Sequence, residues 1–174
     1  MVSRFLRGEG GDREEFAALL AAYPCQREVL DQVVSFEACH PSAFPLARAT
    51  LEPSYTYDDG REELCVVQLH GGVTIMYHGQ QYKLPAVIVL PHGFPREAPI
   101  VRMTPRAGMV RNERSSCVDC SLRVVGGYIE KWEYPFSSLE RLYVDMKEAF
   151  GKSPPLRQRQ HPDGVHGDRG GRGG

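Results

Sequence analysis

The residues of this chain that could carry out chemistry lie between positions 117 and 132, a stretch that begins with Cys117 and Cys120 in a C-x-x-C spacing. This spacing is half of a zinc site, and a second pair of ligands would have to complete it. The other cysteines fall on a predicted helix (Cys25, Cys39) and a predicted strand (Cys65), and no H-x-x-x-H pair lies nearby. We therefore predict two ordinary loop thiols, keep a metal site as the alternative, and expect no cofactor.

Composition indicates one domain in a reducing compartment. The 174 residues are 41% apolar, which is enough for a hydrophobic core. Lys and Arg number 21 against 22 Asp and Glu, so no global charge draws the chain to nucleic acid or to an anionic membrane. No apolar run reaches the roughly 20 residues of a membrane helix. Five irregularly spaced cysteines do not suggest a disulfide framework. We expect a cytoplasmic protein with no nucleic-acid partner and no direct membrane insertion.

The periodicity predicts an α+β fold in which N-terminal helices precede a four-stranded antiparallel meander, a long loop and a C-terminal helix. Asp12 with Glu15 is a capping pair for the first helix, and a second helix is expected at about 27–38. Strands are expected at 54–57, 63–78, 82–90 and 100–103, with a turn at Asp58-Asp59-Gly60 and a bulge or kink at Gly71-Gly72. Residues 1–11 and 157–174 are predicted to be disordered, so the domain is placed at 12–156.

The last third of the chain predicts a loop followed by the best-signalled helix. A short strand at 122–125 and a break at Gly126-Gly127 lead to Trp132, the layout of a loop that passes an active-site groove. Ser137 with Glu140 is read as a capping box, and Gly151 as the C-terminal cap. The expected buried stripe of this helix is Leu139, Leu142, Tyr143, Met146 and Phe150.

Five residues that are scattered in sequence should meet in this topology. Two tyrosines flank the turn between the second and third strands, one methionine begins the long loop, and a Pro-Pro-Leu segment returns after the last helix. A shallow aromatic groove of this kind suits a proline-rich peptide, which arrives already extended. The alternative is that these side chains only pack the sheet edge. The residues are Tyr77, Tyr82, Met109, Pro154 and Leu156.

The order of strand, proline-rich turn, strand and loop, carried by residues 82–105 and 117–132, resembles the ubiquitin-conjugating enzyme fold. The closest resemblance, over about residues 12–156, is to UEV, the inactive variant domain of the ESCRT-I subunit of the tumour-susceptibility and vacuolar protein sorting family. Aligned on Trp132, the chain has Val125 at the nucleophile position and Cys117 in place of the oxyanion asparagine. Valine cannot accept an acyl group, so the resemblance implies a protein that is not an enzyme. The alternative is an active enzyme with a thioester on Cys117 or Cys120.

The resemblance also implies two binding sites. The five groove residues match those that hold Pro-Thr/Ser-Ala-Pro peptides in the family, although Arg157 and Arg106 replace an aromatic residue and a threonine, which would shift peptide preference toward an acidic flank. Ubiquitin would contact the tip of the first hairpin and one face of the sheet. Weak binding is expected there because several side chains are less apolar than in the family, and a merely solvated turn is the alternative. The matching positions are Thr56, Asp58, Asp59, Val89 and Arg102.

The function implied is an adaptor that links ubiquitinated cargo to proline-rich partners on endosomes, with other ESCRT-I subunits as further partners. The alternative is a cofactor that directs the chain linkage of an active ubiquitin-conjugating enzyme. The family's coiled coil and assembly domain have no counterpart in these residues, so a fragment or a divergent short form is expected. The terminal run Arg169-Gly170-Gly171-Arg172 resembles an RNA-contacting segment, but a solvated terminus is favoured because the run carries few charges.

Overall fold

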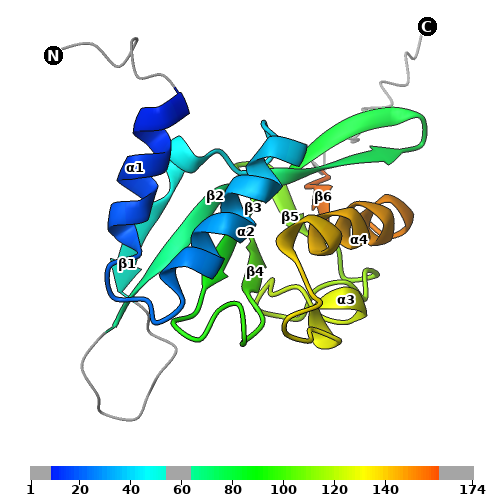
Figure 1. Cartoon of the computed structure of the whole chain (residues 1–174). Coiled ribbons are helices and arrows are strands. Elements are labelled where there is room, and N and C mark those ends of the chain that lie inside the picture. Colours follow the sequence, from blue (N-terminus) through cyan, green and yellow to red (C-terminus); the bar gives the residue numbers. More distant parts are fainter. Residues whose placement is uncertain (1–8, 54–63, 161–174) are drawn as a thin grey trace, which may run out of the picture.

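A computed structural model describes residues 9–53 and 64–160. A four-stranded antiparallel sheet in the order β1-β2-β3-β4 forms its centre, and β5 pairs with β6 in a separate two-stranded ribbon (Figure 1). The strands are β1 (Thr50–Pro53), β2 (Cys65–Tyr77), β3 (Gln80–Leu90), β4 (Ile100–Met103), β5 (Met109–Arg111) and β6 (Leu156–Gln158). The helices are α1 (Glu9–Leu19), α2 (Gln26–Cys39), α3 (Gly127–Glu130) and α4 (Leu139–Lys152), with a 3₁₀ turn η1 (Leu46–Arg48).

The predicted α+β order of helices, meander, loop and C-terminal helix is confirmed. The fourth strand has the expected bounds. β3 is buried on both of its faces from Leu84 to Ile88, as its apolar run to Leu90 predicted, but Val89 is only half-buried. The first helix begins at Glu9, three residues before the expected start, so residues 9–11 are helical. At the other end β6 extends to Gln158, two residues into the segment predicted to be disordered.

The core lies between the sheet and the helices α2 and α4. Alternate residues of β3, from Leu84 to Leu90, join one cluster with the buried stripe of α4 that the sequence predicted. Phe36 of α2 links the two helices, with its ring centroid 5.5 Å from that of Tyr143. Figure 1 shows α1 beside the β1 edge and α4 with α3 toward the other side. The opposite face of the sheet carries none of these core side chains.

Tyr23, in the segment between α1 and α2, connects the helices to the sheet through hydrogen bonds. Its buried hydroxyl donates to the carbonyl oxygen of Leu90 at 2.6 Å and accepts the backbone N–H of Val67 at 2.7 Å. Burial raises the pKa of this phenol to about 12, and the bond from Val67 opposes the shift. The hydroxyl therefore bridges β2 and β3 in its neutral form.

Gly71 and Gly72 of β2 allow the backbone around Ala43 to approach the strand closely and do not introduce a bulge. The pairing of β2 with β3 runs without interruption through Gly71 with Ala86 and Gly72 with Pro85, so the bulge that the two glycines would allow is absent. A Cβ at Gly71 would overlap the carbonyl oxygen of Ala43, which accepts the N–H of Gly72 at 3.0 Å. The sheet needs a residue without a side chain here because the chain after α2 crosses directly over it.

Two predicted details of α4 are wrong. The N-cap is Ser138, whose hydroxyl accepts the N–H of Arg141 at 3.3 Å; the hydroxyl of Ser137 instead accepts the N–H of Glu133 at 2.8 Å. Gly151 is not the C-terminal cap, because the helix continues through Lys152 and Ser153 takes the capping position. Both errors are local, since the buried stripe fixes the face of the helix and not its exact ends.

Residues 122–125 do not form the predicted strand. They make only isolated bridges, Arg123 with Arg102 and Val124 with Val118. The backbone has positive φ at Leu122 (64°) and at Gly126 (76°), which limits the extended stretch between them. The break expected at Gly126-Gly127 is present and leads into α3, a helix of one turn that the sequence did not predict.

Candidate functional site

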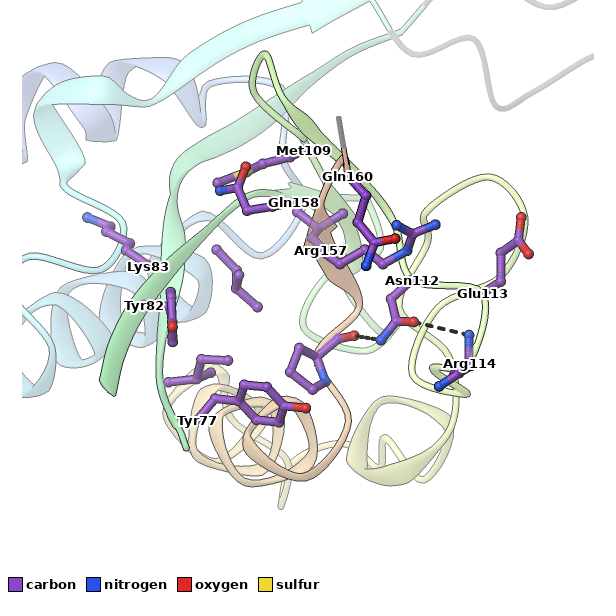
Figure 2. A pocket seen from close by; sticks show the side chains of 14 residues that line it. Tyr77, Tyr82, Lys83, Met109, Asn112, Glu113, Arg114, Arg157, Gln158 and Gln160 are labelled. Atoms are coloured by element: carbon purple, nitrogen blue, oxygen red, sulfur yellow. Dashed lines mark hydrogen bonds between the residues drawn. The ribbon is translucent and has the colours of Figure 1, made fainter. Parts of the chain in front are cut away.

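A cavity of about 730 Å³ opens between the turn that joins β2 to β3 and the β5–β6 ribbon (Figure 2). All five residues that the sequence placed in a groove line it. They come from four separate parts of the chain and meet only in the folded structure. These residues are Tyr77, Tyr82, Met109, Pro154 and Leu156.

The tyrosine wall of the groove is set by the register of β2 and β3. Tyr77 pairs with Gln80 and Ile75 with Tyr82, so Ile75, Tyr77 and Tyr82 share one face of the hairpin. The turn between the strands has positive φ at both central residues, His78 and Gly79, as a tight two-residue hairpin requires. The tyrosines therefore extend the core face of the sheet beyond the end of the core. Tyr82 stays 43% exposed.

The facing wall is the β5–β6 ribbon, which the sequence did not predict. Met109 pairs with Gln158, and Arg111 pairs with Leu156. Asn112 fixes the segment that enters β6, because its side-chain amide donates to the carbonyl of Pro154 and its backbone N–H donates to that of Pro155, both at 2.8 Å. Strands of three residues are too short to show a period, so only the tertiary contact reveals them.

One end of the groove is polar, and most of the residues that form it were not predicted from the sequence. Figure 2 shows Asn112, Glu113 and Arg114 on the side opposite Tyr77 and Tyr82. Arg157, which the sequence singled out, lines the cavity, whereas Arg106 does not. The signal that could have found the others was their position directly after Met109 in the chain. The further lining residues are Ile75, Lys83, Leu84, Asn112, Glu113, Arg114, Gln158 and Gln160.

The second predicted site falls partly outside the described residues. Thr56, Asp58 and Asp59 lie in the segment 54–63, which the structure does not describe. Val89 is half-buried on β3 and pairs with Ile100, while Arg102 of β4 pairs with Val87. Val89, Ile100 and Arg102 therefore share the face of the sheet that points away from α2 and α4, together with Val87, which is buried. We call this surface the open sheet face.

The loop around Cys117 is held in a fixed conformation. The Asp119 carboxylate accepts hydrogen bonds from the Ser121 hydroxyl at 2.7 Å and from the N–H groups of Ser121 and Arg123, and the Ser121 hydroxyl is the largest cause of its lowered pKa. Val125 donates its N–H to the Cys117 carbonyl at 2.9 Å. The indole N–H of Trp132 donates to the carbonyl of Pro95 at 2.8 Å, which ties the loop to the Phe-Pro turn.

The thiols of this loop do not meet other ligating groups. Cys117 Sγ lies 3.6 Å from the carbonyl oxygen of Ser153 at the end of α4, and Cys120 is exposed. Across residues 9–53 and 64–160, no three His, Cys, Asp or Glu side chains gather in a way that could hold a metal ion.

The family model described as "UEV domain" matches residues 15–158. The chain belongs to the UEV domain family. The resemblance inferred from the sequence is thereby confirmed, and the fold is the ubiquitin-conjugating-enzyme-like α+β fold of these domains. Two solved structures are similar in fold to this UEV domain. One is the Vps23 UEV in a complex with ubiquitin, with TM-score 0.63 and 12% identity over 81% of this chain and 94% of the other. The second is the yeast Vps23 UEV domain with a Vps27 PSDP peptide, with TM-score 0.68 and 12% identity over 91% of this chain and 100% of the other.

Curated relatives match this UEV chain over part of their length. Protein ELC of Arabidopsis thaliana is 34% identical over 65% of this chain and 29% of that protein. Ubiquitin-conjugating enzyme E2 variant 3 of Danio rerio is 30% identical over 66% and 23%, and the Tumor susceptibility gene 101 protein of Homo sapiens is 28% identical over 61% and 27%. The chain thus spans less than a third of each of these relatives.

In its described part, no helix combines the length and apolar character needed to cross a bilayer.

Proposed function

We propose that this UEV domain is an adaptor that binds Pro-Thr/Ser-Ala-Pro peptides in its aromatic groove and ubiquitin on its open sheet face and first hairpin. The observation that carries the proposal is the convergence of Tyr77, Tyr82, Met109, Pro154 and Leu156 on one cavity. Two similar structures support it, since one is a UEV with a peptide bound and the other a UEV with ubiquitin bound.

The groove has the properties that a proline-rich ligand needs. Such a peptide is largely extended before binding, so it loses little conformational entropy on entering a shallow site. Aromatic faces offer area to proline rings without many rotamers to immobilise. Tyr77 and Tyr82 supply this surface on one side, and Met109 supplies an adaptable apolar contact on the other.

We infer that the domain does not transfer ubiquitin, with Val125 in the position of the nucleophile. A valine side chain has no lone pair that could attack a thioester. The thiol of Cys117 is badly placed to replace it, because its sulfur points toward the carbonyl oxygens of Ala149 and Ser153, at 3.8 and 3.6 Å. Cys120 is exposed, three residues along the chain from Cys117 and five from Val125.

Ubiquitin is proposed to contact Val89 and Arg102 together with Thr56, Asp58 and Asp59 of the first hairpin. The open sheet face offers modest apolar area there, because Val89 is already half-buried and Arg102 is charged. Weak binding is expected from so small an apolar contribution. The domain predicted at 12–156, with α1 beginning at Glu9 and β6 ending at Gln158, would then carry two separate sites. An adaptor of this kind would act in ESCRT-I, recruited from the cytoplasm to endosomes.

The test is an NMR titration of the ¹⁵N-labelled chain with ubiquitin and, separately, with a Pro-Thr-Ala-Pro peptide. We expect the peptide to shift amides of β5, β6 and the β2–β3 turn, and ubiquitin to shift amides of the open sheet face. Met109→Ala should weaken the peptide about tenfold, equivalent to about 1.4 kcal/mol, and leave ubiquitin binding unchanged. Met76→Ala is the matched control, since Met76 is 60% exposed and does not line the groove.

Three results would count against the proposal. Equal peptide affinity for the Met109 and Met76 variants would refute the groove. Shifts at one common set of residues would refute two separate sites. A covalent ubiquitin adduct formed with activating enzyme and ATP, and lost on reduction, would refute the non-catalytic role.

A further inference from the structure

The β5–β6 ribbon concentrates positive charge that the composition of the whole chain conceals. Residues 106–114 and 157–160 contain five arginines and one glutamate, a local charge of +4, whereas the complete chain has a formal charge of -1. These segments are far apart in sequence and are joined by the pairing of Val110 with Arg157. The pairing therefore gathers basic residues on and beside one wall of the groove. The arginines are Arg106, Arg111, Arg114, Arg157 and Arg159.

Two of these arginines face the groove and are available to a ligand. Arg114 and Arg157 line the cavity and are exposed. Within the described ranges, neither is paired with a carboxylate within 4.0 Å. The third cation of the lining, Lys83, instead donates its Nζ to the carbonyl of Ser42 at 2.8 Å. Glu113 is the single acidic side chain of the lining, so the polar end keeps a net positive charge.

A peptide whose proline-rich core lies against the two tyrosines would extend its flanking residues toward the polar end. An extended peptide advances about 3.1 Å per residue, so a four-residue core covers roughly 12 Å and the residues beyond it reach the rim. Figure 2 shows Arg114 and Asn112 across the cavity from the two tyrosines. A guanidinium offers paired donors that match a carboxylate or a phosphate better than they match a neutral amide.

We propose that the groove selects peptides whose proline-rich core is flanked on one side by an acidic or phosphorylated residue, held by Arg114 and Arg157. The inference rests on the proposed peptide-binding function and adds the chemistry of the flank. Charge complementarity of this kind also speeds the association of the peptide with the groove. The preference for an acidic flank is therefore strongest at low salt.

Fluorescence anisotropy with three labelled peptides tests the proposal. All share the core Pro-Thr-Ala-Pro; one carries two Glu before the core, one carries two Glu after it, and one has Gln at all four positions. We expect one acidic peptide to bind the full 174-residue chain about 3- to 10-fold more tightly than the neutral peptide at 50 mM NaCl. The preference should shrink at 500 mM NaCl, and phosphoserine in place of the Glu nearest the core should increase it.

The decisive quantity is the ratio of acidic to neutral affinity in two charge-matched double variants. Arg114→Gln with Arg157→Gln should bring the ratio to about 1. Arg27→Gln with Arg141→Gln removes the same charge from exposed positions on α2 and α4, outside the groove, and should keep the ratio. A ratio retained in the first pair would show that another group reads the flank and would overturn the assignment.

Two further outcomes separate this inference from the function on which it rests. If all three peptides bind equally well, the flank preference is refuted and peptide binding stands. Binding of a single-stranded RNA oligonucleotide to the ribbon in that case would show that the arginines serve another ligand. If no peptide binds, the proposed function fails and the inference fails with it.

Discussion

Replacement of Tyr82 by alanine tests the groove with a magnitude that follows from the structure. Tyr82 is 43% exposed, and its hydroxyl donates to Gln80 Oε1 at 2.7 Å on the surface. A tyrosine presents about 200 Å², so about 85 Å² remains for a ligand to cover. At about 25 cal/mol per Å², half to full coverage contributes about 1–2 kcal/mol to binding. We therefore expect Tyr82→Ala to weaken Pro-Thr-Ala-Pro peptide binding by about 5- to 30-fold.

The same substitution at Tyr134 supplies the control. Tyr134 is also partly exposed, at 36%, and its hydroxyl also makes a surface hydrogen bond, to Glu28 Oε2 at 2.7 Å, but it does not line the groove. Isothermal titration calorimetry should show a loss of affinity for Tyr82→Ala alone. Both variants should keep the melting temperature within a few degrees, because exposed side chains contribute little to stability. Equal affinities in the two variants would refute the argument that the groove covers Tyr82.

Two predictions concern stability. Tyr23→Phe leaves one backbone donor and one backbone acceptor without their buried partner, so urea unfolding should show a loss of about 2–4 kcal/mol; a loss below about 1 kcal/mol would contradict the bridging role. Desolvation, followed by the charge of Lys147, lowers the pKa of His40, against the opposing effect of Glu140. The unfolded chain then binds a proton more readily than the folded chain, so unfolding free energy should fall as pH drops below about 6.5. His40→Gln should reduce this slope, and an unchanged slope would show that other groups cause it.

The parts of this protein that were predictable from sequence are those in which one periodicity dominates. The stripe of α4 repeats at helical spacing and is buried as predicted, and the apolar run of β3 is long enough to indicate burial on both faces. The ends of α4 were not predictable, because Ser137 and Ser138 are both good caps and only the packing of the preceding loop decides between them. The β5–β6 ribbon was missed because Met109–Arg111 and Leu156–Gln158 gain strand geometry only from each other.

The family, the order of the main helices and strands, and the five residues that line the groove could be predicted from the sequence, because a resemblance to a family depends on residue types in a fixed order along the chain. Only the tertiary structure decided that Arg114 and Arg157 line the groove and that Arg106 does not. It also decided that Gly71 is required by the carbonyl of Ala43. Each of these facts concerns a contact between segments that are distant in the chain, and no local pattern records which distant backbone comes close to a given residue.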